Sequence, residues 1–173
     1  MEGISWFHST DYSVRGTTIT LEDDIRVLSN VELFSEFSEE QFRLLAFGSQ
    51  KLTFPKGTYL FHDGQSTDGG YVIVKGKVEL VQQRYDADHV MGTFGAGDLL
   101  GEMAIITKNR RTGSAIIVEN CELIKISRAT VHRILGEYPE LAVGLRRRIM
   151  ESVAAMASNL EAVETRMRQI DDS

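Results

Sequence analysis

The chain has 173 residues, of which 42% are hydrophobic, and its 15 glycines and 2 prolines give no sign of disorder. Its length suits one compact domain with an appendage better than two full domains. A formal net charge of −6 leaves no broad positive surface for nucleic acid. The single cysteine, Cys121, excludes an internal disulfide and any four-cysteine metal site.

The sequence also lacks the features of a membrane or secreted protein. No apolar run approaches the roughly 20 residues of a transmembrane helix. The N-terminal stretch MEGISWFHSTD does not have the basic-then-apolar pattern of a signal peptide. We therefore expect a cytoplasmic protein without membrane association.

Two helix starts are predicted before residue 50, after an irregular segment over residues 1–19. Thr20 precedes Leu-Glu-Asp, as a helix N-cap would. The run Ser38-Glu-Glu-Gln41 has the spacing of a capping box in front of an apolar helical pattern. Short helices are therefore expected ahead of the main fold.

From about residue 50 the hydrophobic period changes from helical to two. Seven runs have this character, namely LTF, TYLFH, GGYVIV, KVELVQQ, HVMGTF, SAIIV and ELIKI. The segments between them, such as PKG, DGQSTDGG and GAGD, have the composition of turns. Seven short strands at this spacing predict a mainly β fold with flanking helices, of the β-roll or double-stranded jelly-roll type.

The pattern becomes helical again after ELIKI. Ser127 can cap RATVHRILGEY, and Pro139 suits the first turn of a long final helix. We therefore divide the chain into three parts: an irregular segment over residues 1–19, a β-roll domain with short helices over residues 20–138, and a long C-terminal helix over residues 139–173.

The long helix carries a heptad pattern. Its apolar residues alternate in spacing between four and three: Ile149, Val153, Met156, Leu160, Val163, Met167 and Ile170. A helix packed on its own domain also has such a face, but this regularity late in a chain favours a partner helix. We expect a homodimer through this helix, and a role as a lid over the chain's own pocket is also compatible with the pattern.

The stretch GEMAIITKNRRTGS (101–114) combines a carboxylate, a predicted helical turn and two arginines. A helical turn that begins at Gly101 offers free N–H groups and a positive dipole end to an anion, and a returning arginine would complete the site. Glu102 would repel a phosphate unless the ligand also offers a hydroxyl. A phosphate joined to a ribose satisfies both requirements. Gly113 and Ser114 let backbone N–H groups come close.

GEMAII followed by RRTGSAIIVENCELIKI resembles the phosphate-binding cassette of the cyclic nucleotide-binding domain family. The usual form of this cassette is Phe-Gly-Glu-x-Ala-Leu, a short loop and Arg-x-Ala-x. The likeness continues upstream through FPKGTYLFHDGQSTDGGYVIVKGKVELV and GAGDLLGE, and it covers about residues 30–165. It implies a sensor similar to catabolite activators and kinase regulatory subunits, with cAMP or cGMP as the ligand and no cofactor or metal.

The resemblance also implies roles for individual residues. Glu102 would accept the ribose 2′-OH, and the Gly101 backbone would help to position it. Arg111 would pair with the cyclic phosphate, and it is favoured over Arg110 because the family's small residues begin directly after its arginine. The expected ligand-binding residues are Leu80, Met91, Gly101, Glu102, Met103, Ala104, Arg111, Thr112 and Gly113.

Base recognition is weakly specified. Leu100 replaces the usual aromatic residue, and Met156 and Ala157 stand where catabolite activators place polar residues that contact the base. Thr112 and Gly113 would supply donors near the phosphate, and the Thr112 hydroxyl could accept from the amino group of a syn guanine. Such a bond contributes only about 0.5–1.5 kcal/mol. We expect both nucleotides to bind, with cAMP as the commoner ligand of bacterial-type members.

Simpler interpretations exist for several of these residues. Glu102 and Arg111 could form a surface ion pair, and Leu80 and Met91 could be ordinary core residues or the apolar wall behind ribose and base. The 4 histidines share no metal-ligand spacing, and no catalytic constellation can be assigned. We therefore expect neither a metal site nor an enzyme.

The chain ends at Ser173, so we expect no helix-turn-helix domain after the long helix and no direct contact with nucleic acid. We predict a stand-alone sensor that binds a cyclic purine mononucleotide. Rearrangement of its C-terminal helix, coupled through the helical segment 127–138, would signal to an unknown downstream protein. The alternatives are a structural copy that no longer binds nucleotide and a transcription-regulator-like protein that acts through a separate partner.

Overall fold

The computed structural model describes residues 20–171, except for the side chains at positions 160, 163, 164, 167 and 169–171. The irregular segment predicted over residues 1–19 lies outside the described residues. The elements in chain order are α1 (Leu21–Ser29), the 3-10 helix η1 (Glu32–Phe34), α2 (Glu39–Phe47), β1 (Gln50–Phe54), β2 (Tyr59–Phe61), β3 (Gly69–Arg84), β4 (Ala87–Phe94), β5 (Leu99–Leu100), α3 (Glu102–Ile106), β6 (Ser114–Ser127), α4 (Arg128–Glu137) and α5 (Glu140–Asp171).

The predicted N-caps of the first two α-helices are confirmed. At α1 the Thr20 hydroxyl accepts from the Asp23 N–H, and the Asp23 carboxylate accepts from the Thr20 N–H. At α2 the same reciprocal pair joins Ser38 and Gln41. Each cap satisfies backbone donors that the first helical turn leaves without partners.

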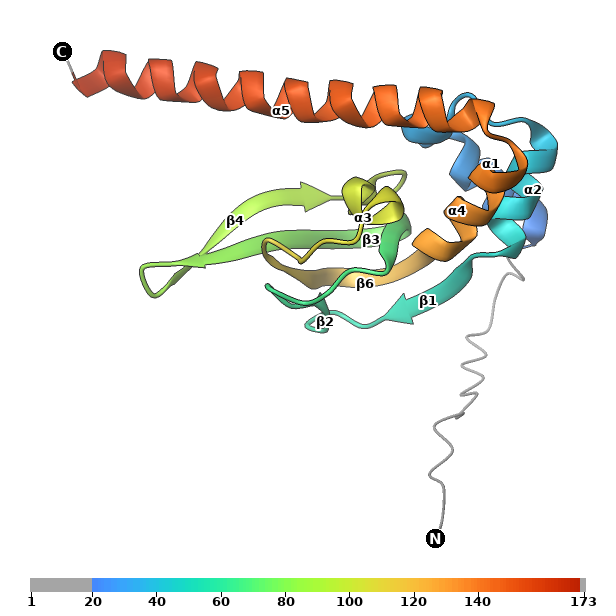
Figure 1. Cartoon of the computed structure of the whole chain (residues 1–173). Helices are drawn as coiled ribbons and strands as arrows, with labels where there is room; N and C mark the ends of the chain where they lie inside the picture. Colours follow the sequence, from blue (N-terminus) through green and yellow to red (C-terminus); the bar gives the residue numbers. More distant parts are fainter. Residues whose placement is uncertain (1–19, 172–173) are drawn as a thin grey trace, which may run out of the picture.

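The mainly β fold with flanking helices is confirmed. Within the described residues, a six-stranded antiparallel sheet has the order β1-β6-β3-β4, with β2 also paired to β6 and β5 to β3. Figure 1 shows β3 and β6 side by side along the roll, with the β3–β4 hairpin extending away from the helices α1, α2 and α4. α5 lies along the side of the roll that carries α3.

The division into seven short strands was wrong in its boundaries. GGYVIV and KVELVQQ form the single strand β3, and SAIIV and ELIKI form the single strand β6. The glycine that interrupts the sequence pattern, Gly76, has φ +95° and lies against the backbone of Asn120, where a Cβ would overlap the carbonyl oxygen. It therefore lets β3 bend through an irregular register against β6 without ending the strand. β5, at Leu99–Leu100, was not predicted.

Two hydrophobic clusters stabilise the chain, one under the helices and one inside the roll. The helical cluster includes Leu28, Phe34, Leu45, Val131 and Ile134, all at most 1% exposed. The roll cluster comprises Phe61, Tyr71, Ile73, Val78, Leu100, Ala115, Ile117, Cys121 and Leu123. Because Ile105 of α3 packs in the helical cluster while Leu100, just before α3, packs in the roll cluster, the 101–106 turn joins the two.

Cys121 is a core residue in the middle of β6 (Ser114–Ser127). Its side chain is 1% exposed, and burial raises the pKa of its thiol. A neutral, buried thiol is a poor nucleophile. Its burial in the roll cluster indicates a packing role for Cys121.

The first turns of α5 are anchored, whereas its later part is exposed. The N-cap of α4 at Ser127 is confirmed by its hydrogen bond from the Thr130 N–H, and α5 begins one residue after Pro139. Leu141, Leu145 and Ile149 are buried. The next two heptad residues, Val153 and Met156, are 48% and 64% exposed. The remaining heptad side chains, Leu160, Val163, Met167 and Ile170, lie outside the described residues.

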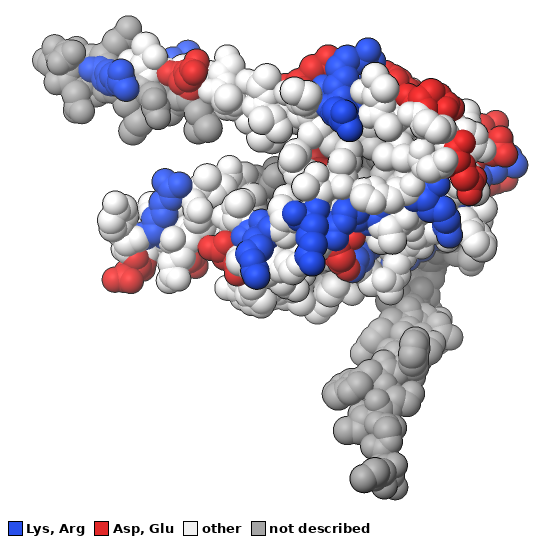
Figure 2. All heavy atoms as spheres, in the orientation of Figure 1, with Lys and Arg blue, Asp and Glu red and all other residues white. Residues whose placement is uncertain are grey.

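The surface carries both signs of charge. On the face drawn in Figure 2, basic and acidic side chains are interspersed, and acidic ones gather over the helical end of the molecule. None of the described helices combines the length and the apolarity needed to cross a bilayer.

Candidate functional site

Gly101 occupies the sharp turn between β5 and α3. Its φ of 90° and ψ of 45° are left-handed, a conformation that glycine adopts without strain. A Cβ built on Gly101 would lie 2.7 Å from Nη1 of Arg111. The guanidinium of Arg111 therefore lies close to the backbone where α3 begins.

Arg111 is a buried cation without a carboxylate partner among the described residues. Its side chain is 9% exposed, and Nη2 donates to the Gly69 carbonyl at 2.8 Å. The guanidinium carbon lies 4.1 Å from the centre of the Phe61 ring and 5.8 Å from that of Tyr71. Burial lowers the pKa of Arg111, and the charges of Tyr71 and Asp68 oppose this effect. Arginine stays charged nevertheless, so this position favours a bound anion.

Asp68, whose charge acts on Arg111, is held by another cation. Nζ of Lys125 donates to Oδ2 of Asp68 at 2.6 Å, and this hydrogen bond lowers the pKa of the Asp68 carboxyl. The ion pair engages the Asp68 carboxylate, so the remaining N–H groups of the Arg111 guanidinium stay available to a ligand.

The two neighbouring arginines have different environments. Arg110 is exposed, and its Nη1 donates to the Gly64 carbonyl at 2.8 Å. The Arg111 backbone pairs with the same loop, since its N–H donates to Gln65 O and its carbonyl accepts from the Gly64 N–H. Arg111 is therefore buried while Arg110 stays at the surface.

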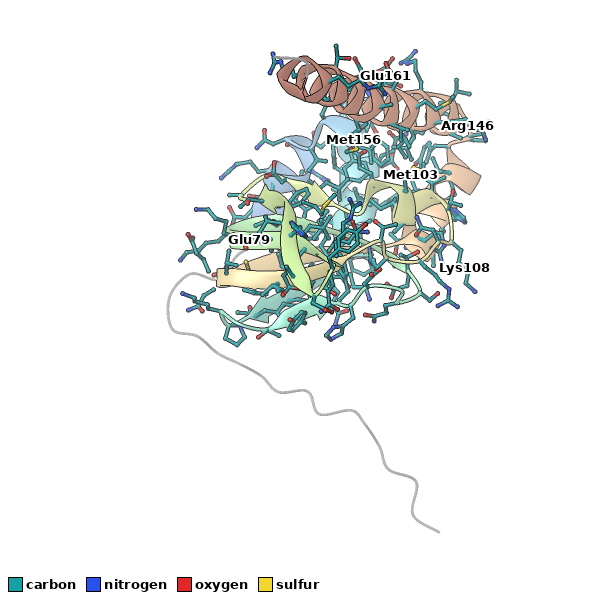
Figure 3. All side chains as sticks on the ribbon, turned by 90° about the vertical axis from the view of Figure 1, so that its left-hand side faces the viewer. Glu79, Met103, Lys108, Arg146, Met156 and Glu161 are labelled. Carbon is teal, nitrogen blue, oxygen red and sulfur yellow. The ribbon has the colours of Figure 1, made fainter. Side chains whose placement is uncertain are left out.

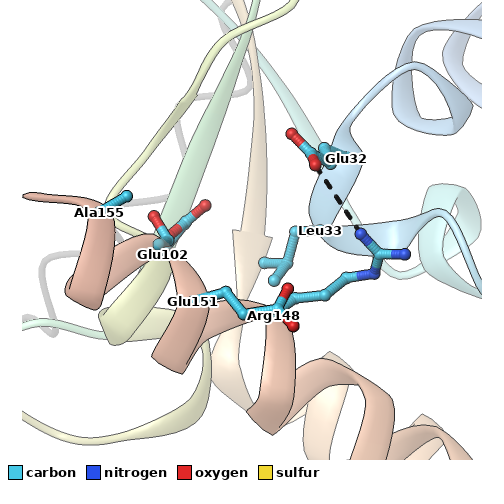
Figure 4. Close-up of a pocket in the computed structure, with 7 residues that line it drawn as sticks. Glu32, Leu33, Glu102, Arg148, Glu151 and Ala155 are labelled. Carbon is cyan, nitrogen blue, oxygen red and sulfur yellow. Dashed lines mark ion pairs between the residues drawn. The ribbon is translucent and has the colours of Figure 1, made fainter.

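Glu102 lies on the α5 side of the turn. It lines a cavity of about 320 Å³ whose other lining residues are Glu32, Leu33, Arg148, Glu151, Ser152 and Ala155. Figure 4 shows Glu102 on one side of this cavity and the Glu32–Arg148 pair, 3.9 Å apart, on the other. The Glu102 side chain makes no hydrogen bond or ion pair with any described residue. Arg111 is not among the lining residues, so this cavity contains one half of the predicted pair.

The C-terminal side of the cassette packs tightly on β3. A Cβ on Gly113 would lie 2.8 Å from Val81 O and 3.5 Å from Cδ1 of Leu80, so this approach requires glycine. Leu80 is half-buried against the roll cluster. Thr112 is exposed, and its carbonyl accepts from Nε2 of Gln82 at 3.2 Å.

The remaining predicted residues differ in exposure. Ala104 is 2% exposed and belongs to the core, whereas Met103 is 42% exposed on the side of the roll that α5 covers (Figures 1 and 3). Met91, on β4, is 55% exposed.

Two residues of α4 that the sequence analysis missed hold the end of α3. Arg128 donates from Nη1 to the carbonyls of Ala104 at 3.1 Å and Thr107 at 3.4 Å. Nε2 of His132 lies 2.9 Å from the Ile106 carbonyl. The sequence contains no motif for these contacts, because they join side chains to backbone more than 20 residues away. Among the described residues no cluster of His, Cys, Asp and Glu could hold a metal ion.

Two solved structures are similar to this chain. A cyclic nucleotide-binding-like protein from Brucella abortus bv. 1 str. 9-941 has a solved structure that is 42% identical, with a TM-score of 0.61, over 66% of this chain and 98% of that one. The Thermus thermophilus catabolite activator protein, at 24% identity, matches in fold with a TM-score of 0.66 over 76% of this chain and 62% of that one.

Two curated relatives are larger than this chain. The cyclic AMP receptor protein of Thermus thermophilus is 28% identical over 125 residues, which are 69% of this chain and 58% of that protein. Lysophospholipase NTE1 of Pyricularia oryzae is 28% identical over 102 residues, which are 58% of this chain and only 7% of that enzyme. The family model of the cyclic nucleotide-binding domain matches residues 51–138. The chain therefore belongs to the cyclic nucleotide-binding domain family.

Proposed function

We propose that the chain binds a cyclic purine mononucleotide, cAMP or cGMP, and that Arg111 pairs with its cyclic phosphate. The observation that carries this proposal is the buried Arg111 guanidinium, which has no carboxylate within 4.0 Å among the described residues. A buried charge without a counter-ion is unfavourable, and a phosphate with two oxygens in the guanidinium plane compensates it.

Glu102 supports a second contact, with the ribose of the nucleotide. Its carboxylate has no partner among the described residues and is therefore free to accept from a ribose 2′-OH. Since Ser152 and Ala155 of α5 line the same cavity, a ligand hydroxyl bound at Glu102 lies next to α5. Occupancy of the site then alters the surroundings of the helix.

The contacts of α4 support a route from the site to α5. Arg128 and His132 hold the carbonyl end of α3, so a shift of α3 on phosphate binding draws α4 with it. α5 follows α4 after a short connection at Tyr138–Pro139. The nucleotide can shift this equilibrium only by the difference between its affinities for the two arrangements.

In the proposed function the chain is a non-catalytic sensor. It forms a homodimer through α5 and acts on a downstream protein. The exposed Val153 and Met156 support an α5 interface. Both nucleotides bind with modest discrimination, and the relationship to the Thermus thermophilus cyclic AMP receptor protein favours cAMP as the natural ligand.

Isothermal titration calorimetry of the full chain with each nucleotide tests the proposal. We expect Arg111→Ala to weaken binding by about 2–5 kcal/mol, because a buried charged interaction loses one partner. That is about 30-fold to several thousand-fold in Kd. Arg110→Ala is the matched control and leaves the affinity near that of the unmodified chain, because its side chain is at the surface. Equal affinities for Arg111→Ala and the unmodified chain would refute the phosphate assignment.

One observation favours a second candidate, a copy of the domain that no longer binds nucleotide. Arg111 does not line the cavity that contains Glu102. A melting experiment separates the two candidates, because a ligand at 100 times its Kd stabilises a fold by about 2.7 kcal/mol. If neither nucleotide raises the melting temperature at millimolar concentration, the second candidate is correct.

A further inference from the structure

Two aromatic rings lie beneath the guanidinium of Arg111, and we call them the aromatic shelf. Phe61 comes from β2 and Tyr71 from β3, and their ring centres lie 6.2 Å apart with planes inclined by 26°. Both side chains are buried, with 5% and 8% exposed. The guanidinium carbon is 4.1 Å from the Phe61 ring centre, which is the distance of a close cation–π contact.

The contact places the guanidinium carbon over the face of the Phe61 ring. Phosphate oxygens bind instead to N–H groups in the guanidinium plane, and among these Nη2 already donates to the Gly69 carbonyl. A carboxylate would occupy those same N–H groups and compete with the ligand. An aromatic ring attracts the cation without using its hydrogen-bond donors.

Backbone contacts fix the remaining freedom of the side chain. Nη2 donates to the Gly69 carbonyl, and Nη1 lies against the Cα of Gly101. The shelf is itself held in place, because Phe61 pairs with Ala115 of β6 and Tyr71 pairs with Leu100 of β5. The guanidinium is therefore held by the contact with the Phe61 ring and by the hydrogen bond from Nη2 to the Gly69 carbonyl.

We propose that Phe61 is a positioning residue for anion recognition, which holds the buried Arg111 guanidinium in place without neutralising it. Tyr71, farther away at 5.8 Å, makes a weaker contribution. This inference rests on the proposed function, because it assigns the pre-organisation of Arg111 for the cyclic phosphate to the ring. Its consequence is that affinity depends on an aromatic side chain at position 61 and not only on apolar volume there.

The test compares variants of the full chain in calorimetric titrations with cAMP and cGMP. Phe61→Leu removes the ring and keeps an apolar side chain, and we expect it to weaken Kd by about 5- to 30-fold. Phe61→Tyr keeps the ring and should retain affinity close to that of the unmodified chain. Phe34→Leu, in the helical cluster at 0% exposed, is the control for loss of a buried ring and should leave Kd unchanged.

A second measurement does not require ligand. In the unmodified chain, the ring current of Phe61 should shift the Nε–H resonance of Arg111 upfield in an arginine side-chain NMR spectrum. Phe61→Leu should abolish this shift. If Phe61→Leu does not fold, Phe61→Met takes its place, since methionine fills irregular space without a ring.

The outcomes distinguish this inference from the proposed function. Absence of binding by the unmodified chain would refute the proposed function and this inference with it. Binding by the unmodified chain with an unchanged Kd in Phe61→Leu would refute the inference alone. Equal weakening in Phe61→Leu and Phe61→Tyr would also refute it, because the shape of the side chain and not its ring would then be decisive.

Discussion

Replacement of Gly101 by alanine is expected to displace the Arg111 side chain and so weaken nucleotide binding. A matched replacement of Gly97 measures the loss of stability that backbone strain causes by itself. Gly101 has φ +90°, and the new Cβ would lie 2.7 Å from Nη1 of Arg111. Gly97 has the same φ of +90° and no atom within 4 Å of an added Cβ. Gly101→Ala and Gly97→Ala therefore share the backbone strain and differ in the contact with Arg111.

Two effects are expected: backbone strain lowers the stability of both variants, and displacement of Arg111 weakens binding in Gly101→Ala alone. A left-handed alanine costs roughly 1–2 kcal/mol in either variant. For a chain of this size, that lowers the melting temperature by roughly 2–8 °C. The contact at Gly101 adds little to this cost, because Nη1 is the far end of a flexible side chain and can move. The guanidinium is displaced instead, and loss of a hydrogen bond to a charged group costs about 1.5–3 kcal/mol of binding.

The assay pairs thermal unfolding with calorimetric titration of cAMP. We expect similar melting temperatures for the two variants, a Kd near that of the unmodified chain for Gly97→Ala, and a Kd about 10- to 150-fold weaker for Gly101→Ala. Equal affinities in the two variants would refute the reasoning, because they would show that Arg111 does not need its place against Gly101 to bind the ligand.

Three further predictions concern specificity, assembly and coupling. Thr112→Ala should change the ratio of the cGMP and cAMP affinities by no more than about tenfold in competition titrations, and a hundredfold preference that survives the change would show that discrimination arises elsewhere. Val153→Glu combined with Met156→Glu should convert a dimer to a monomer in sedimentation at tens of micromolar, whereas Ser158→Glu, exposed on the opposite face of α5, should not. A monomeric unmodified chain would refute the α5 interface. Arg128→Gln should abolish nucleotide-induced changes in hydrogen exchange along α5 while nucleotide still binds, and unchanged exchange effects would show that α4 is not the route.

The sequence predicted those features that depend on local chemistry. The capping box at Ser38 and the N-cap at Ser127 were correct, because a cap is satisfied within three residues of its helix start. Strand boundaries were less accurate. Gly76 is a residue typical of turns, yet it lies in the middle of β3. The strand continues there because β3 pairs with the backbone of β6, which the local sequence does not show.

At the site, too, features set by nearby residues can be distinguished from features set by contacts between distant segments. The sequence favoured Arg111 over Arg110 for the phosphate, and this choice stays a prediction; the loop that carries both arginines buries Arg111 and leaves Arg110 exposed. The Phe61 ring beneath it could not be predicted, because residues 61 and 111 meet only once β2 is in place beside β6. Nor could the sequence show that Glu102 lies in a cavity with Arg148 of α5, since this depends on how the last helix packs.

Because only the first turns of α5 are buried among its described residues, a small rotation at that end would move the far end of the helix by a larger distance. Its fixed end is the buried group Leu141, Leu145 and Ile149, and from Ile149 the helix continues to Asp171. At a rise of about 1.5 Å per residue, this arm is about 33 Å long, so a tilt of about 10° at the anchor would carry its far end through roughly 6 Å. A displacement too small to disturb either hydrophobic cluster would thus become a movement as large as a side chain at the end of the helix.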